Sequence, residues 1–139
     1  MSDSCLFCAI VAGTTAAHVV LDEPEVFAFL DVRPVFKGHV LVVPRIHHET
    51  ITDLPPALLA TLFEAVQRMA AAVPAALGAT GTFVAVNNIV SQSVPHVHVV
   101  PRTKGDGLRG FFWPRTKYAD ATEADAYAAR LRDALKVTP

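Results

Sequence analysis

The chain of 139 residues has only two cysteines, Cys5 and Cys8, and no apolar run of the roughly 18 residues that a membrane-spanning helix needs. It also lacks an excess of either charge, since 12 Lys and Arg residues face 13 Asp and Glu residues and the net charge is −1. This balance argues against a large surface for nucleic acid or for a membrane. A basic segment followed by an apolar one is missing at the N-terminus, so we expect no signal peptide and a cytoplasmic protein.

What the chain does contain is typical of a globular domain. Hydrophobic residues make up 52% of it and charged residues 18%, which disfavours disorder. Its length suits one domain, residues 1–139, with a core over about 5–102 and a C-terminal tail and helix over 103–139.

Apolar periodicity predicts the elements of that domain. Apolar residues three and four apart follow Pro55 and indicate one long amphipathic helix that ends near Pro74. A short helix or turn is expected at 5–11 and is ended by Gly13. Short apolar runs indicate strands at residues 18–21, 26–30, 39–44, 81–87 and 94–100. The predicted fold class is α+β, with an antiparallel sheet of about five strands, the long central helix and a C-terminal helix.

The two cysteines form a Cys5-x-x-Cys8 motif. In a reducing compartment this spacing suits two thiolates on one zinc ion, which needs two further ligands, and His47 and His96 are available. A redox pair is a second reading, although that role usually places the motif between a strand and a helix. A pair of reduced, buried cysteines is the third.

Two histidines, His96 and His98, stand two residues apart in a run of valines. In a strand they share one face, because successive side chains point to opposite faces. They could be polar residues on an exposed strand. With the neutral donors Gln92 and Ser93 and a third imidazole at His39, they also suit an anionic ligand, and a neutral imidazole is a competent nucleophile.

These motifs resemble those of the histidine triad (HIT) family of nucleotide-binding hydrolases and transferases. They occur in the family's order from residue 5 to residue 98: Cys5-x-x-Cys8, Ala28-Phe29-Leu30-Asp31, Gly38-His39-Val40-Leu41, Pro44-Arg45-x-His47, Asn87-Asn88 and Gln92-Ser93-Val94-x-His96-x-His98. The resemblance implies a HIT-like fold and a homodimer.

The chain departs from the family at its signature, which has three histidines at alternate positions. Anchored on the Gln-Ser pair, His96 is the first histidine, His98 the second, and Val100 replaces the third. Anchored on the Val-Val-Pro-Arg run at 99–102, the first histidine is lost and His96 becomes the second. We favour the first register, because the Gln-Ser pair has to reach the same phosphate as the nucleophile.

The resemblance implies a role for each of these side chains. His98 attacks the α-phosphorus and forms a nucleotidyl-histidine intermediate. Gln92 and Ser93 meet the charge of the phosphate, and His39 lies beside it. Structural Zn²⁺ is held by four residues: Cys5, Cys8, His47 and His96.

The resemblance also implies a purine nucleotide, or a conjugate of one, as the partner. Phe29 and Leu30 are then candidates for the base pocket, Asp31 for the ribose hydroxyls and Asn87 for the neighbourhood of the phosphate. Each also has a structural reading, as core residues, as a turn-capping aspartate or as part of a loop. The tail at 103–115, with Trp113 and Arg115, could contact a substrate, contact a partner subunit or pack on the core.

Three functions follow for testing. The first is a hydrolase or transferase acting at the α-phosphate of nucleoside phosphoramidates, adenylates or dinucleoside polyphosphates. The second is a nucleotide-binding module with little or no catalysis, because the third histidine is absent. The third is a zinc-stabilised scaffold.

Overall fold

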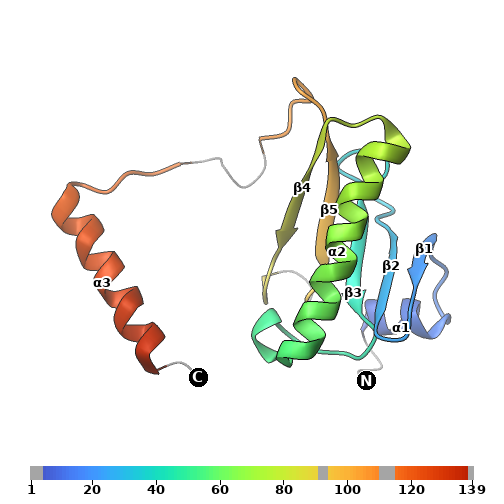
Figure 1. Ribbon diagram of the computed structural model, residues 1–139, viewed down its shortest axis with the longest axis horizontal. Helices are drawn as coiled ribbons and strands as arrows, with labels where there is room; N and C mark the ends of the chain where they lie inside the picture. Colours follow the sequence, from blue (N-terminus) through green and yellow to red (C-terminus); the bar gives the residue numbers. More distant parts are fainter. Residues whose placement is uncertain (1–4, 91–93, 110–114, 138–139) are drawn as a thin grey trace. The chain divides into compact units, whose positions relative to one another are not determined.

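The computed structural model describes residues 5–90, 94–109 and 115–137. The chain forms two compact units, Met1–Asp106 and Gly107–Pro139. The predicted core at 5–102 lies within the first unit, which contains the whole sheet (Figure 1). Within the described part of the chain, no helix combines the length and the apolar character needed to cross a membrane.

The first unit is built on one antiparallel sheet, as predicted. Its five strands lie in the order β1-β2-β3-β5-β4. They span Val19–Asp22 (β1), Val26–Leu30 (β2), Val40–Pro44 (β3), Gly81–Val86 (β4) and Val97–Arg102 (β5). Strand β5 therefore joins the two halves of the sheet by pairing with β3 on one side and β4 on the other.

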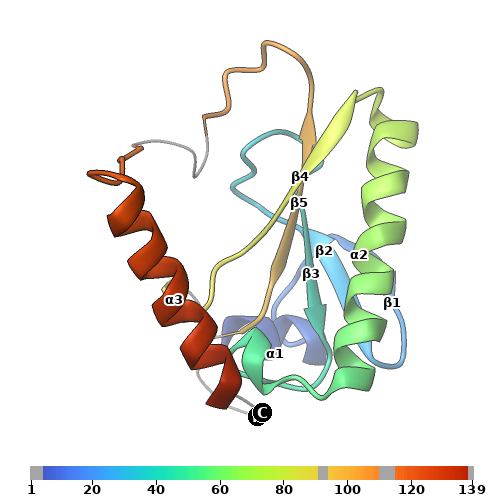
Figure 2. The same ribbon diagram turned by 60° about the vertical axis from the view of Figure 1, so that its left-hand side comes forward.

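Strand side chains alternate between two packed faces. One core contains Val26, Ala28, Val40, Val42, Val97 and Val99, together with residues of the long helix α2, Pro56–Leu77. The other contains Phe27, Phe29, Leu41 and Val43, together with Phe7 and Ile10 of the short helix α1, Leu6–Ala12. The two helices therefore cover opposite faces, α2 the first and α1 part of the second (Figure 2).

The long helix continues beyond its predicted end. Pro74 lies inside α2, and the helix ends at Gly78, whose φ of 71° is in the left-handed region. Proline lacks an N–H group, but the Pro74 carbonyl still accepts the N–H of Gly78 at 3.0 Å. The short helix α1 ends at Gly13 in the same left-handed conformation, as predicted.

Strand β5 begins later than predicted, at Val97 and not at Val94. Pro95 cannot donate to a neighbouring strand, and the chain turns there because the His96 N–H donates to the Val94 carbonyl at 2.7 Å. His96 therefore lies just before the strand, while His98 lies within it and pairs with Leu41 of β3.

The second unit contains helix α3, Ala121–Val137, in the predicted place. Asp120 accepts the N–H of Glu123 at 2.9 Å and so caps the start of the helix.

Candidate functional site

Chain parity brings the candidate residues to one face of the sheet. Asp31 follows β2 on the face of Phe27 and Phe29, and His39 precedes β3 on the face of Leu41. His98 lies on the same face, because its neighbours Val97 and Val99 are in the α2 core. The Asp31 N–H donates to the His39 carbonyl at 2.9 Å and so extends the β2–β3 ladder to these two residues.

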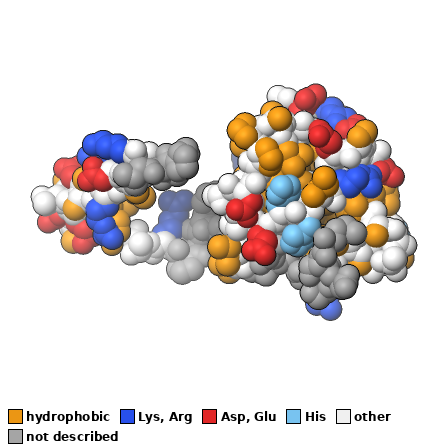
Figure 3. Space-filling model, turned by 90° about the horizontal axis from the view of Figure 1, so that it is seen from below, with side chains coloured by type: hydrophobic (Ala, Val, Ile, Leu, Met, Phe, Trp, Pro, Cys, Tyr) orange, Lys and Arg blue, Asp and Glu red, His pale blue; other side chains and the backbone are white. Residues whose placement is uncertain are grey.

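A pocket of about 320 Å³ lies on this face, a size within the range of small-molecule sites. Its walls are mostly apolar, with His96, His98 and Asp31 as its ionisable groups. Histidine side chains also reach the surface of the first unit among hydrophobic and acidic ones, as Figure 3 shows.

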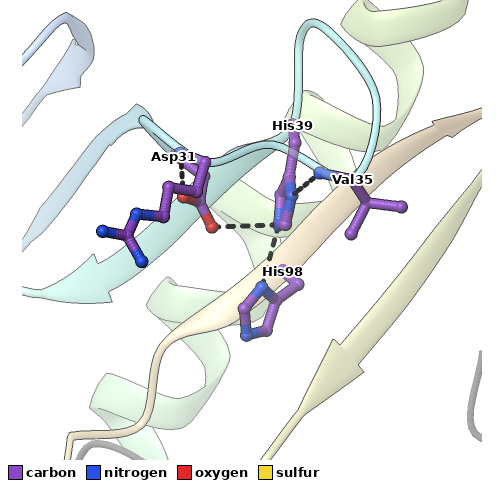
Figure 4. Close-up of polar contacts among 5 residues, drawn as sticks. Asp31, Val35, His39 and His98 are labelled. Atoms are coloured by element: carbon purple, nitrogen blue, oxygen red, sulfur yellow. Dashed lines mark hydrogen bonds and ion pairs between the residues drawn. The ribbon is translucent and has the colours of Figure 1, made fainter.

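The side chains of Asp31, His39 and His98 form a network of polar contacts, to which one backbone N–H also donates (Figure 4). The Val35 N–H donates to Nδ1 of His39 at 3.1 Å, and His39 Nε2 lies 2.9 Å from Nδ1 of His98. A carboxylate oxygen of Asp31 lies 3.8 Å from His39 Nε2. Because His39 Nδ1 has to accept, the proton of a neutral His39 is on Nε2, and this N–H donates to His98. A neutral His98 therefore carries its own proton on Nε2.

Gly38 allows His39 to take this position. Its φ of 97° is in the left-handed region, and a Cβ atom there would lie 2.2 Å from Cδ1 of Leu77. The turn before β3 thus favours glycine because of its positive φ, while the exposed Leu77 side chain could move away from a Cβ atom.

His96 has the opposite tautomer. Its Nδ1 lies 2.6 Å from the Val94 carbonyl, which can only accept, so the Nδ1 carries the proton and Nε2 carries the lone pair. Among the described residues Nε2 has no hydrogen-bond partner, and the ring, although only 3% exposed, lines the pocket. The ring lies 5.0 Å from the Phe7 ring and 4.9 Å from the His98 ring, between centroids.

Burial keeps two of these imidazoles neutral. It is the main cause that lowers the pKa of His98 to about 4, and the neighbouring His96 and His39 lower it further, while Asp31 opposes them. Burial also lowers the pKa of His39, again against the attraction of Asp31. Both rings are therefore neutral at pH 7, as the hydrogen bonds between them require.

A second group of donors lies at the start of α1. Ligand atoms of Cys5, Cys8 and His47 all lie within 4.8 Å of one another. Cys8 Sγ lies 3.2 Å from Nδ1 of His47, close to the roughly 3.5 Å that a sulfur and a nitrogen on one tetrahedral zinc ion would have. The Cys8 N–H also donates to Sγ of Cys5 at 3.3 Å. Two thiolates and an imidazole are a donor set that suits zinc.

The structure brings together three of the four predicted zinc ligands. His96 is outside the group, because its Nδ1 is bonded to the Val94 carbonyl and its ring packs between Phe7 and His98. Val94, and not His96, lines a small cavity together with Cys8 and His47.

The other predicted residues divide into three sets. Phe29, Leu30 and Asp31 line the same pocket as the two histidines. Asn87 directly follows β4 and does not line that pocket. The remaining predictions, Gln92, Ser93 and Trp113, lie outside the described residues.

Sequence reasoning missed one wall of the pocket. Leu6, Phe7 and Ile10 of α1 line it, together with Ala17 in the segment before β1. Their signal is the i, i+4 spacing of Leu6 and Ile10, which puts both on one side of a helix.

Comparisons with known proteins agree with the fold and the motifs. The HIT domain family model matches residues 12–105. The uncharacterized HIT-like protein Rv1262c of Mycobacterium tuberculosis is 41% identical over 108 residues, which are 75% of this chain and 75% of that protein. The adenosine 5'-monophosphoramidase hnt1 of Schizosaccharomyces pombe is 33% identical over 115 residues, which are 80% of this chain and 84% of that protein.

A solved structure extends the agreement to a metal-containing protein. The crystal structure of a Zn-bound histidine triad family protein from Mycobacterium smegmatis matches with a TM-score of 0.72 and 34% identity. The match covers 94% of this chain and 97% of that one. The predicted resemblance and fold are confirmed, and the chain belongs to the HIT domain family.

Proposed function

We propose that this protein is a hydrolase that binds an adenine nucleotide conjugate, such as adenosine 5'-phosphoramidate, in the pocket and cleaves it at the α-phosphorus. The observation that carries the proposal is the pair of opposite tautomers at the pocket, a lone pair on His96 Nε2 and a proton on His98 Nε2. One side chain can attack phosphorus while its neighbour donates to a phosphoryl oxygen. The relatives named adenosine 5'-monophosphoramidases support this class of substrate.

We assign the attack to His96, which selects the second of the two registers. Its Nε2 lone pair forms the bond to phosphorus, and the bond to the leaving nitrogen breaks as that nitrogen takes a proton from solvent. The ring then carries a positive charge, which strengthens the hydrogen bond from Nδ1–H to the Val94 carbonyl. Water attacks phosphorus next, loses a proton to solvent and releases the nucleotide and the neutral imidazole.

His98 has a different part in this mechanism. Its Nε2–H donates to a non-bridging oxygen and stabilises the charge that develops there. His39 is a positioning residue, because it donates to Nδ1 of His98 and so keeps the proton on the nitrogen that faces the substrate. A nucleophilic His98 would need that proton elsewhere, which the Val35–His39–His98 chain opposes.

The remaining walls suit a nucleoside. Phe29, Leu30 and Leu41 give apolar surface for a base, and Asp31 lies near enough to His98 to accept from ribose hydroxyls beside the phosphate. We further propose that Cys5, Cys8 and His47 hold zinc. The metal would supply structure, by tying the start of α1, which carries one wall of the pocket, to the segment after β3.

The test is to trap the covalent intermediate. Wild-type protein is quenched during turnover of adenosine 5'-phosphoramidate, and a nucleotidyl adduct is sought by intact-protein mass spectrometry. We expect the adduct in wild type, its loss in His96→Gln, and a retained adduct with slower turnover in His98→Gln. An adduct that survives in His96→Gln and disappears in His98→Gln would return the attack to His98. Nucleotide binding without turnover in wild type would favour the binding module.

A further inference from the structure

The group formed by Cys5, Cys8 and His47 has one donor fewer than a closed zinc site. Structural zinc is almost always held by four protein ligands, whereas sites with three keep a position for a small molecule. The predicted fourth ligand, His96, donates from Nδ1 to the Val94 carbonyl at 2.6 Å and lines the pocket. Among the described residues, no fourth His, Cys, Asp or Glu has its ligand atom within 4.8 Å of all three donors.

A small cavity lies beside two of the three donors, Cys8 and His47. It is lined by Cys8, His47 and Val94, with Phe7, Val11 and Arg45 among its other walls. Its volume is about 10 Å³, which is close to the room that one water molecule needs. Val94 has only 4% of its surface exposed, and its side chain has no atom that can bind a metal.

We propose that zinc on Cys5, Cys8 and His47 completes its coordination with water, or with another ligand of that size, in the cavity beside Val94. The metal centre of this protein is then an open Cys₂His site with an exchangeable position. This inference rests on the zinc proposed above and is independent of the proposed hydrolysis.

Val94 leaves the proposed zinc site without a fourth protein ligand, and it also holds His96 in place at the pocket. Its side chain lines the metal cavity, while its carbonyl accepts from Nδ1 of His96. A substitution there changes the metal cavity and leaves the backbone acceptor in place. The metal's ligands can therefore be altered without removing the contact that fixes the tautomer of His96.

The test supplies the missing donor at position 94. Val94→Cys places a thiol in the cavity, and Val94→Ala differs from it only by the sulfur atom. Zinc affinity is measured on the full chain by competition with a chelating dye. Thiolates are counted from the charge-transfer absorption of the Co²⁺-substituted proteins.

We expect Val94→Cys to tighten zinc binding by more than the roughly 10–100-fold that outer-shell partners contribute, and to show a third thiolate. Val94→Ala should keep wild-type affinity and two thiolates. If Val94→Cys matches Val94→Ala in both readouts, the cavity is not the fourth position and the inference fails. If wild type binds neither zinc nor Co²⁺, the zinc proposal fails with it, while the nucleotidyl adduct still reports on hydrolysis separately. Circular dichroism of the metal-free variants checks that each is folded.

Discussion

Among the described residues of the first unit, two groups of three possible metal donors are found, and the contacts of one of them oppose metal binding. Cys5, Cys8 and His47 form the first group, and Asp31, His39 and His98 form the second. In both, the donor atoms lie within 4.8 Å of one another. The distances between donor atoms therefore do not distinguish the two groups. The groups differ in the other contacts that their imidazole nitrogens make.

The second group is fixed as a proton-holding network. A histidine that binds a metal through one nitrogen normally donates with the other. Bound through Nε2, His39 would need a proton on Nδ1, where the Val35 N–H already donates at 3.1 Å. In the first group Nδ1 of His47 faces the Cys8 sulfur at 3.2 Å and is placed to share a metal with it. The Val35 N–H thus favours a proton-holding role over metal binding for the second group, which the residue types alone do not decide.

The largest expected effect is on zinc binding, which should depend on the first group of donors and not on the second. Cys8→Ser should weaken zinc binding by several orders of magnitude, because a thiolate is exchanged for a poor ligand. Asp31→Asn should leave both the affinity and a stoichiometry of one zinc per chain unchanged. Dye competition and metal analysis after dialysis measure both. A stoichiometry of two in wild type that falls to one in Asp31→Asn would place metal in the second group.

The next effect tests the network itself. His39→Ala removes the donor that holds the proton of His98 on Nε2, so turnover of adenosine 5'-phosphoramidate should fall by about 10²–10⁴-fold. Its zinc content should stay at the wild-type level. His18→Ala, at an exposed histidine, is the matched control and should keep full turnover. Full activity in His39→Ala would show that the tautomer of His98 does not depend on this contact.

The smallest effect is on stability against pH. The pKa of His98 is lowered to about 4 in the folded protein, whereas an unfolded histidine titrates near the ordinary value of about 6.5. Between these two values the unfolded chain binds the extra proton, so stability falls as the pH falls from about 6.5 to about 4. Urea unfolding at several pH values should show a shallower fall in His98→Gln. Equal slopes in wild type and His98→Gln would contradict a lowered pKa at His98.

Much of the fold could be predicted because its periodicities are local. The continuous apolar runs at Val26–Leu30 and at residues 39–44 are typical of strands buried on both faces, and the structure has strands at these or nearly these bounds. The end of α2 could not be predicted from Pro74, because a proline in the last turn still leaves a carbonyl for Gly78 to use. The predicted start of strand β5, at Val94, is too early. The strand begins only after a turn in which the His96 N–H donates to the Val94 carbonyl, and the apolar pattern does not show this turn.

The candidate site was predictable by residue type and less so by role. The resemblance named Asp31, His39 and His98 as candidate site residues, and all three do lie together. The wall of the pocket that α1 forms could not be predicted, because it depends on how this short helix packs across the sheet. The roles of His96 and His98 were also open, because a strand's alternation treats two histidines two residues apart as equivalent.

The amino-acid sequence by itself determined the family, the antiparallel α+β fold, the face on which the imidazoles lie and the Cys-x-x-Cys donors. These follow from patterns within a few residues and from motifs in a fixed order. Only the tertiary structure decided which nitrogen of each imidazole carries the proton, and that Val94, not His96, lines the cavity beside Cys8 and His47. The physical reason is that the tautomer and the ligation of a histidine depend on the partner that its ring meets in the folded chain. For His96 this partner is the Val94 carbonyl, two residues away, whereas for His98 it is the ring of His39, 59 residues away.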